Sequence, residues 1–93
     1  MVVLKGSGSV IAAPEALPAI NPTGNALLAT AGTGDVLAGW TGGLWAAGGH
    51  ARSAALAAVW QHGHAADLAA TAGRRTPLLA GDLVAALATQ PVR

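Results

Sequence analysis

Residues 21–47 of this 93-residue chain read NPTGNALLATAGTGDVLAGWTGGLWAA. A polar loop containing glycines leads there into an apolar segment, which we expect to be helical from Asp35 to about Ala47. The backbone N–H groups of Gly32, Thr33 and Gly34 would then lie at a helix N-terminus. Such N–H groups lack intrahelical acceptors, and the helix dipole favours negative charge beside them. The stretch therefore predicts an anion-binding site.

A carboxylate at the start of the same helix adds a chemical group to that site. We expect Asp35 at the first helical position, where the dipole favours its ionised form. A base beside a phosphate-binding backbone suggests phosphoryl chemistry. A plain explanation stays open for Gly32, Gly34 and Asp35 alone, because Asp is common in first turns and Gly-x-Gly often marks only a tight turn.

The longer string is more specific than this triplet. Asn21-Pro-Thr-Gly-Asn25, followed by Leu28-Ala-Thr-Ala-Gly-Thr-Gly-Asp-Val-Leu-Ala-Gly39, closely resembles the signature of the ADP/ATP-dependent NAD(P)H-hydrate dehydratases of the ribokinase-like superfamily. The flanking motifs also come in the family's order, with a Lys-Gly-Ser-Gly-Ser segment before the signature and a helical motif, His62-Gly63 with Ala66-Asp67, after it. One departure is Ala26, where the family often has Pro. The resemblance covers nearly the whole chain but only the C-terminal portion of the family's domain.

The resemblance implies a reaction and a set of site residues. The reaction is the dehydration of hydrated NADH and NADPH, driven by ADP or ATP with Mg²⁺. Asp35 would bind the hydrate and act as the base on its hydroxyl, while Gly32, Thr33 and Gly34 would form the anion hole. Gly34 and one further segment would bind the nucleotide, and the residues of that segment are Lys5, Gly6, Ser7, Gly8 and Ser9. Taken without the resemblance, the same segment is a turn by composition.

The order of elements points to one fold class. Short strands are expected first and three helices after them, the second and third spanning about 51–72 and 78–88. The strand candidates are Val2–Leu4 and Val10–Ala12, which could pair as a hairpin, and a very short strand at 19–21. We therefore expect an α/β protein in which residues 1–93 form the C-terminal fragment of a ribokinase-like dehydratase domain.

Composition excludes several classes of function. A net charge of +1, with three Trp and no Phe or Tyr, offers neither the charge nor the stacking surface that nucleic acids need. Without Cys there are no disulfides or thiolate sites, and the longest uncharged helical candidate is too short to span a membrane. We expect a soluble, cytoplasmic protein. Because 53% of residues are hydrophobic and 10% are charged, its partner is expected to be the remainder of the same domain or a second copy of the chain.

The histidines and the acidic residues predict no metal site. His62 and Asp67 share no metal-ligand spacing with a third donor, so the histidines are expected to be structural or exposed. The side chains of Asn21, Thr23 and Asn25 are expected to bond to their own backbone as turn formers.

The apolar helix carries glycines at 39, 42 and 43, each costing about 1 kcal/mol relative to Ala. We expect close backbone packing on that face to offset the cost, and Trp40 and Trp45 to fill space between elements.

Two other functions remain open at this point. One is a small-molecule kinase of the same superfamily acting on a vitamin precursor, with the same loop and base. The other is a catalytically inactive fragment that binds nucleotide weakly. The Asn-Pro-Thr-Gly-Asn lead-in and the Asp-Val-Leu-Ala-Gly continuation favour the dehydratase.

Overall fold

The computed structural model describes residues 2–4, 10–12, 17–29, 32–48 and 50–89. Three short strands form an antiparallel sheet of order β1-β2-β3, in which β1 is Val2–Leu4, β2 is Val10–Ala12 and β3 is Ala19–Ile20. Val3 lies opposite Ile11 in the first pair of strands, and Ile11 lies opposite Ala19 in the second. The expected pairing of the first two strands and the short third strand are both confirmed.

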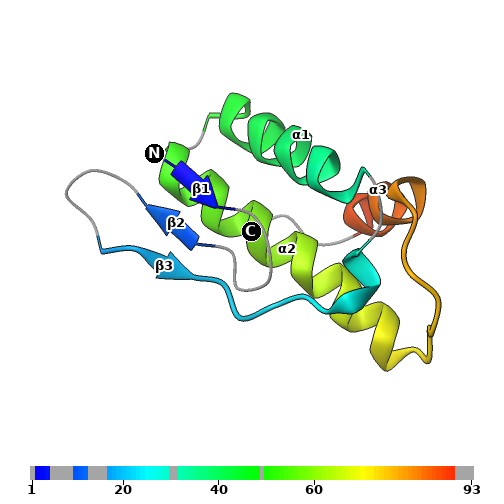
Figure 1. The fold of residues 1–93 in the computed structure, drawn as a ribbon. Helices are drawn as coiled ribbons and strands as arrows, with labels where there is room; N and C mark the ends of the chain where they lie inside the picture. The colour runs from blue at the N-terminus through cyan, green and yellow to red at the C-terminus, as the bar shows by residue number, and fades with distance from the viewer. Residues whose placement is uncertain (1, 5–9, 13–16, 30–31, 49, 90–93) are drawn as a thin grey trace.

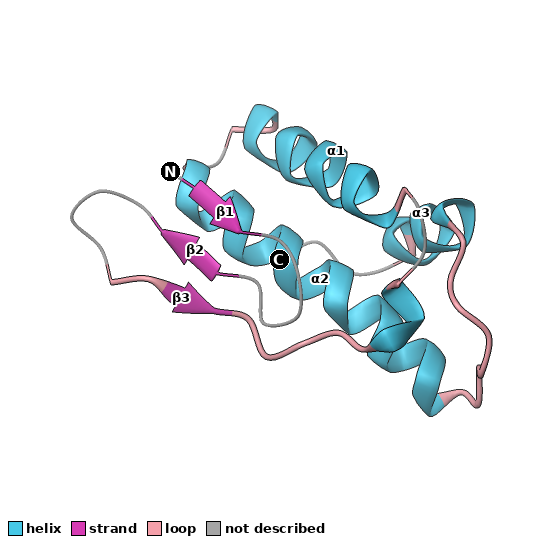
Figure 2. Cartoon of the chain, in the orientation of Figure 1, coloured by secondary structure: helices cyan, strands magenta, loops and turns pink. Residues whose placement is uncertain are grey.

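Three α-helices and one short 3₁₀ helix follow the sheet (Figure 1). Helix α1 spans Thr33–Ala46, α2 spans Ala51–Thr71 and α3 spans Ala80–Ala88, while the 3₁₀ turn η1 covers Ala26–Leu28. Figure 2 shows how the helices dominate the described chain, with strands confined to its start. Short strands followed by three helices is the predicted α/β order, and it is confirmed.

Helix α2 is the element on which the others pack. α1 lies alongside it, and β2, η1 and α3 also contact it (Figure 1). Many of its inward side chains are alanines, and Ala55, Ala58 and Ala66 are completely buried. Small side chains let neighbouring backbones approach closely, so this composition suits a helix with partners on several sides.

The apolar core has two parts, both built on α2. Beneath the sheet the buried residues are Ile11, Leu37, Ala55, Ala58 and Val59. Near α3 they are Ala65, Leu83 and Leu87.

Trp40 of α1 packs against both parts of the core, and its indole N–H donates to Gln61 Oε1 at 2.7 Å. The expectation of a space-filling role is confirmed for Trp40. It is wrong for Trp45, which lies near the C-terminal end of α1 and is 52% exposed.

The glycine face of α1 is open. A Cβ atom added at Gly39, Gly42 or Gly43 would meet nothing within 4 Å beyond the helix's own backbone. The close packing expected there is therefore not made by the described part of this chain. Gly39 and Gly43 instead line an apolar groove of about 470 Å³, together with Trp40, Val84 and other side chains of α1 and α3.

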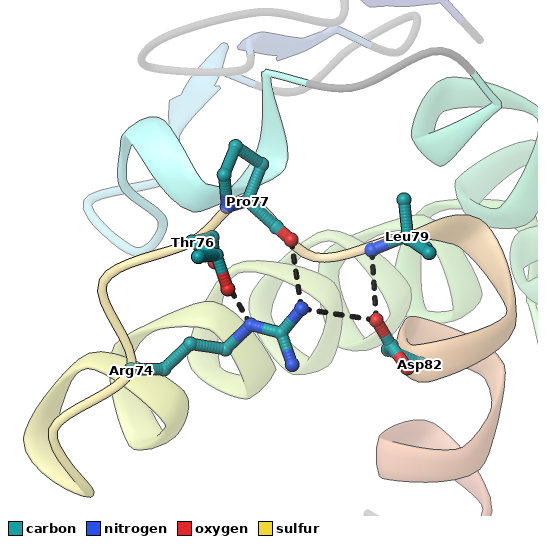
Figure 3. A network of polar contacts seen from close by, with 5 residues as sticks. All are labelled: Arg74, Thr76, Pro77, Leu79 and Asp82. Carbon is teal, nitrogen blue, oxygen red and sulfur yellow. Dashed lines mark hydrogen bonds and ion pairs between the residues drawn. The ribbon is translucent and has the colours of Figure 1, made fainter.

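A polar cluster sets the start of α3 (Figure 3). The Asp82 carboxylate accepts from the backbone N–H of Leu79 at 3.0 Å and from the Arg74 guanidinium at 3.1 Å. Arg74 also donates to the carbonyls of Thr76 and Pro77, at 2.8 and 2.7 Å. This cluster holds Leu79 extended ahead of the helix, so α3 begins at Ala80 and not at the expected residue 78.

The isolated 93-residue chain should self-associate, because large apolar side chains lie on its surface. Leu17, Ile20 and Leu79 are all mostly exposed, and they add to the apolar groove beside Gly39. Sedimentation of the purified chain at micromolar concentration checks this. A stable monomer would contradict it.

None of the described helices combines the length and hydropathy needed to cross a bilayer.

Candidate functional site

The predicted anion site lies at the N-terminus of α1. Gly32 is the N-cap residue, with φ of 91°, a left-handed conformation that favours glycine. The first helical hydrogen bond runs from the Val36 N–H to the Gly32 carbonyl at 3.1 Å. The N–H groups of residues 33–35 therefore precede the helical hydrogen-bond ladder, as an anion site of this kind requires.

Thr33 fixes that turn to the loop before it. Its hydroxyl donates to the Leu28 carbonyl at 2.7 Å, and the residue is only 6% exposed. Thr33 is thus a buried anchor through its side chain. Only its backbone is placed to take part in an anion hole.

Asp35 is the third helical residue of α1, not the first as expected, because the left-handed Gly32 starts the helix two residues earlier. It remains in the first turn, where the helix dipole still favours a carboxylate. The side chain is exposed and forms no hydrogen bond or ion pair with the described residues. The other two described carboxylates, Asp67 and Asp82, both have partners. Asp35 is therefore the carboxylate available for chemistry among them.

The polar side chains of the signature loop bond both within the loop and to α2. Thr23 Oγ1 lies 3.0 Å from Asn21 Oδ1 and 3.3 Å from the Trp60 carbonyl. The Asn25 side chain accepts from the Leu27 N–H at 2.9 Å and so begins η1. The expectation that these side chains bond to the backbone of their own loop is confirmed for Asn25 and for Asn21, whose amide donates to the Thr23 carbonyl at 3.2 Å. It is wrong for Thr23, whose hydroxyl bonds to a side chain of the loop and to the backbone of α2.

Asp67 of α2 holds the middle of this loop. Its carboxylate accepts from the Gly24 N–H and from Asn25 Nδ2, each at 3.1 Å. Gly24 has φ of 106°, a conformation that glycine adopts without strain. The sequence does not predict this contact, although the motif that resembles the family contains Asp67.

Gly63, one helical turn before Asp67, gives the loop room to approach. A Cβ atom there would overlap Thr23 Oγ1 and would lie 2.7 Å from the Thr23 carbonyl carbon and 2.8 Å from the Gly24 nitrogen. The i, i+4 spacing of Gly63 and Asp67 puts both on one helix face. That spacing is the sequence signal that could have revealed the loop contact.

The histidines differ in their surroundings. His62 is 8% exposed, and its Nε2 lies 2.9 Å from the Thr33 carbonyl oxygen. His64 stacks on Trp60 with ring centroids 4.3 Å apart, and His50 is exposed. A structural role, as expected, is therefore observed for His62 and His64.

Within the described ranges, no three His, Asp or Glu side chains gather where they could hold a metal ion. Mg²⁺ is usually bound through one or two carboxylates together with substrate phosphates. The exposed Asp35 beside the predicted anion site fits that arrangement, in which most Mg²⁺ ligands come from the nucleotide and water. The predicted nucleotide segment, Lys5 to Ser9, lies outside the described residues.

Comparisons with known proteins agree with the signature. The family model described as NAD(P)H-hydrate dehydratase matches residues 1–88. The ADP-dependent (S)-NAD(P)H-hydrate dehydratase of Neisseria meningitidis is 48% identical over 86 residues, which are 91% of this chain and 29% of that protein. A bifunctional NAD(P)H-hydrate repair enzyme of Moorella thermoacetica is 44% identical over 84 residues, or 90% of this chain and 16% of that protein.

Comparison with a solved structure agrees with these matches and extends them to the fold. The ADP/ATP-dependent NAD(P)H-hydrate dehydratase of Bacillus subtilis, co-crystallised with ATP and Mg²⁺, superposes with a TM-score of 0.84 at 41% identity. The match covers 92% of this chain and 31% of that one, so this chain spans about a third of its length. Because the family model matches almost every residue, the chain belongs to the NAD(P)H-hydrate dehydratase family.

Proposed function

We propose that this chain is the C-terminal part of a ribokinase-like domain that dehydrates hydrated NADH and NADPH at the expense of ADP or ATP. The observation that carries the proposal is the position of Asp35, whose exposed carboxylate lacks any partner among the described residues and lies in the first turn of α1. The activities named for the relatives from Neisseria and Bacillus support the choice of substrate.

In this proposal Asp35 is the general base. Its carboxylate takes the proton from the hydroxyl of the hydrate, and the hydroxyl oxygen then accepts the terminal phosphoryl group of the nucleotide. Loss of phosphate from the ring carbon, together with a proton from the neighbouring ring carbon, restores the nicotinamide double bond. Asp35 forms no covalent bond with the substrate in this proposal. It needs only to be ionised and to lie close to the hydroxyl.

Negative charge that spreads over the phosphoryl group needs donors in fixed positions. The N–H groups of Gly32, Thr33 and Gly34 would serve as the anion hole, with the helix dipole behind them. Lys5 to Ser9, together with Gly34, would contact the nucleotide. Mg²⁺ would be held mainly by the nucleotide's phosphates, with Asp35 as a carboxylate that this chain offers, and would neutralise part of their charge.

The proposed partners are ADP or ATP and hydrated NAD(P)H, with the rest of the domain or a second copy of the chain completing the pocket. Neither nucleic acid nor membrane is part of the proposal. The cytoplasmic location expected from the sequence stays a prediction.

An assay of the protein that carries this chain tests the proposal. Hydrated NADH should return to NADH when ADP or ATP is added with Mg²⁺, with one phosphate released for each NADH formed. Hydrated NADH left unchanged by either nucleotide would overturn it. Phosphorylation of an alcohol-bearing vitamin precursor instead would identify a kinase, and nucleotide binding without turnover would identify an inactive fragment.

A further inference from the structure

We propose that His62 is a positioning residue that orients the first peptide groups of α1 for anion binding. The role concerns the anion hole of the proposed reaction, and to that extent it rests on the proposed function. His62 comes from α2, is almost fully buried and has its Nε2 2.9 Å from the carbonyl oxygen of Thr33.

The chemistry of this contact determines which imidazole nitrogen of His62 carries a proton. A carbonyl oxygen can only accept a hydrogen bond, so Nε2 must carry the proton. The carbonyl has two lone pairs, which lets it accept from His62 and from the next turn of α1 together. His62 therefore adds a hydrogen bond to a helix whose own hydrogen bonds do not depend on it.

The consequence for the site comes from the planarity of the peptide bond. The Thr33 carbonyl and the Gly34 N–H belong to one planar trans peptide group and point in opposite directions. A donor that holds the carbonyl therefore also fixes the direction of the Gly34 N–H, a proposed member of the anion hole.

The rest of the structure holds both ends of the contact. On the α1 side, the Thr33 hydroxyl is bonded to the Leu28 carbonyl at 2.7 Å. On the α2 side, Gln61 is bonded to the Trp40 indole at 2.7 Å, and Gly63 lies against the loop backbone. Because His62 is also buried, its ring has little room to turn away from the carbonyl.

The test compares His62→Leu, which cannot donate, with His62→Gln, whose amide N–H can. His64→Leu is the matched control, since His64 lies two residues away and stacks on Trp60 outside the anion site. For the folded fraction of the protein that carries this chain, kcat should fall by about 10- to 100-fold in His62→Leu with a smaller change in KM for hydrated NADH, because misplaced donors act on the transition state. His62→Gln should recover most of the loss, and His64→Leu should behave as the parent.

Two further measurements need no turnover. Nitrogen NMR of the parent protein should find His62 protonated at Nε2, and hydrogen exchange at the Gly34 amide should be faster in His62→Leu than in the parent. A proton only on Nδ1 would overturn the inference, even if His62→Leu cannot be purified in folded form. Unchanged kcat and unchanged Gly34 exchange in folded His62→Leu would also overturn it. Absence of activity in the parent would instead count against the proposed function, while the two NMR measurements would still decide the role of His62.

Discussion

Replacing Asp35 with Asn should remove nearly all dehydratase activity while the fold stays intact. Loss of a general base typically lowers the rate by about 10²–10⁴-fold, because the substrate hydroxyl then keeps its proton. Thermal stability should change little, since the Asp35 side chain has no partner among the described residues and Asn is tolerated near a helix start. Turnover of hydrated NADH and the melting temperature of the purified variant provide the two measurements.

Asp82→Asn is the matched control for this substitution. Asp82 is also the third residue of its helix, but it lies in α3 and is bonded to Arg74 and to the Leu79 N–H (Figure 3). Its replacement should cost about 0.5–2 kcal/mol of stability, as for a weakened cap, and leave kcat near that of the parent. Turnover by Asp35→Asn within about twofold of the parent would exclude the role of general base. Equal losses of activity in the two variants would show that the effect is general to carboxylates at helix N-termini and is not specific to Asp35.

Local sequence features were enough to predict the elements of this fold. Apolar runs interrupted by glycine and proline located the three strands, and the change from a polar loop to an apolar segment located α1. The start of α1 was misplaced by two residues because a left-handed Gly32 and an ordinary turn glycine look the same in a sequence. The start of α3 was misplaced for a similar reason, since it depends on the partner that Asp82 finds at Arg74.

The candidate site was predicted only where its residues are neighbours in the chain. Gly32 to Asp35 form one continuous turn, so helix physics identified them together. The contacts of His62 with Thr33 and of Asp67 with Gly24 join positions 29 and 43 residues apart, and no local propensity encodes such pairs. The open glycine face of α1 shows a second limit of prediction from sequence. Glycines in a helix indicate that a partner can approach closely, but they do not say whether the same stretch of chain supplies it.

Gly63→Ala should destabilise the protein and detach the signature loop from α2. A methyl group at Gly63 would overlap the Thr23 side chain and would lie within 2.8 Å of backbone atoms of Thr23 and Gly24. Backbone atoms cannot turn aside as a flexible side chain can, so the loop itself must move. That movement would weaken the Thr23 contact with the Trp60 carbonyl and the Gly24 contact with Asp67.

The sign of the effect distinguishes this prediction from ordinary helix propensity. Ala in place of Gly stabilises a helix interior by about 1 kcal/mol, whereas overpacking costs about 1–3 kcal/mol and more where backbone must shift. Because the clash at Gly63 is with the peptide group that joins Thr23 to Gly24, we expect a net loss of stability in denaturant unfolding and a fall in turnover as Asp67 loses its hold on the loop. Gly81→Ala is the control, since a Cβ atom there meets nothing within 4 Å and stability should be kept or raised. If Gly63→Ala were as stable and as active as the parent, Gly63 would not be the residue that admits the signature loop to α2, and the loop would have to be held by its polar contacts alone.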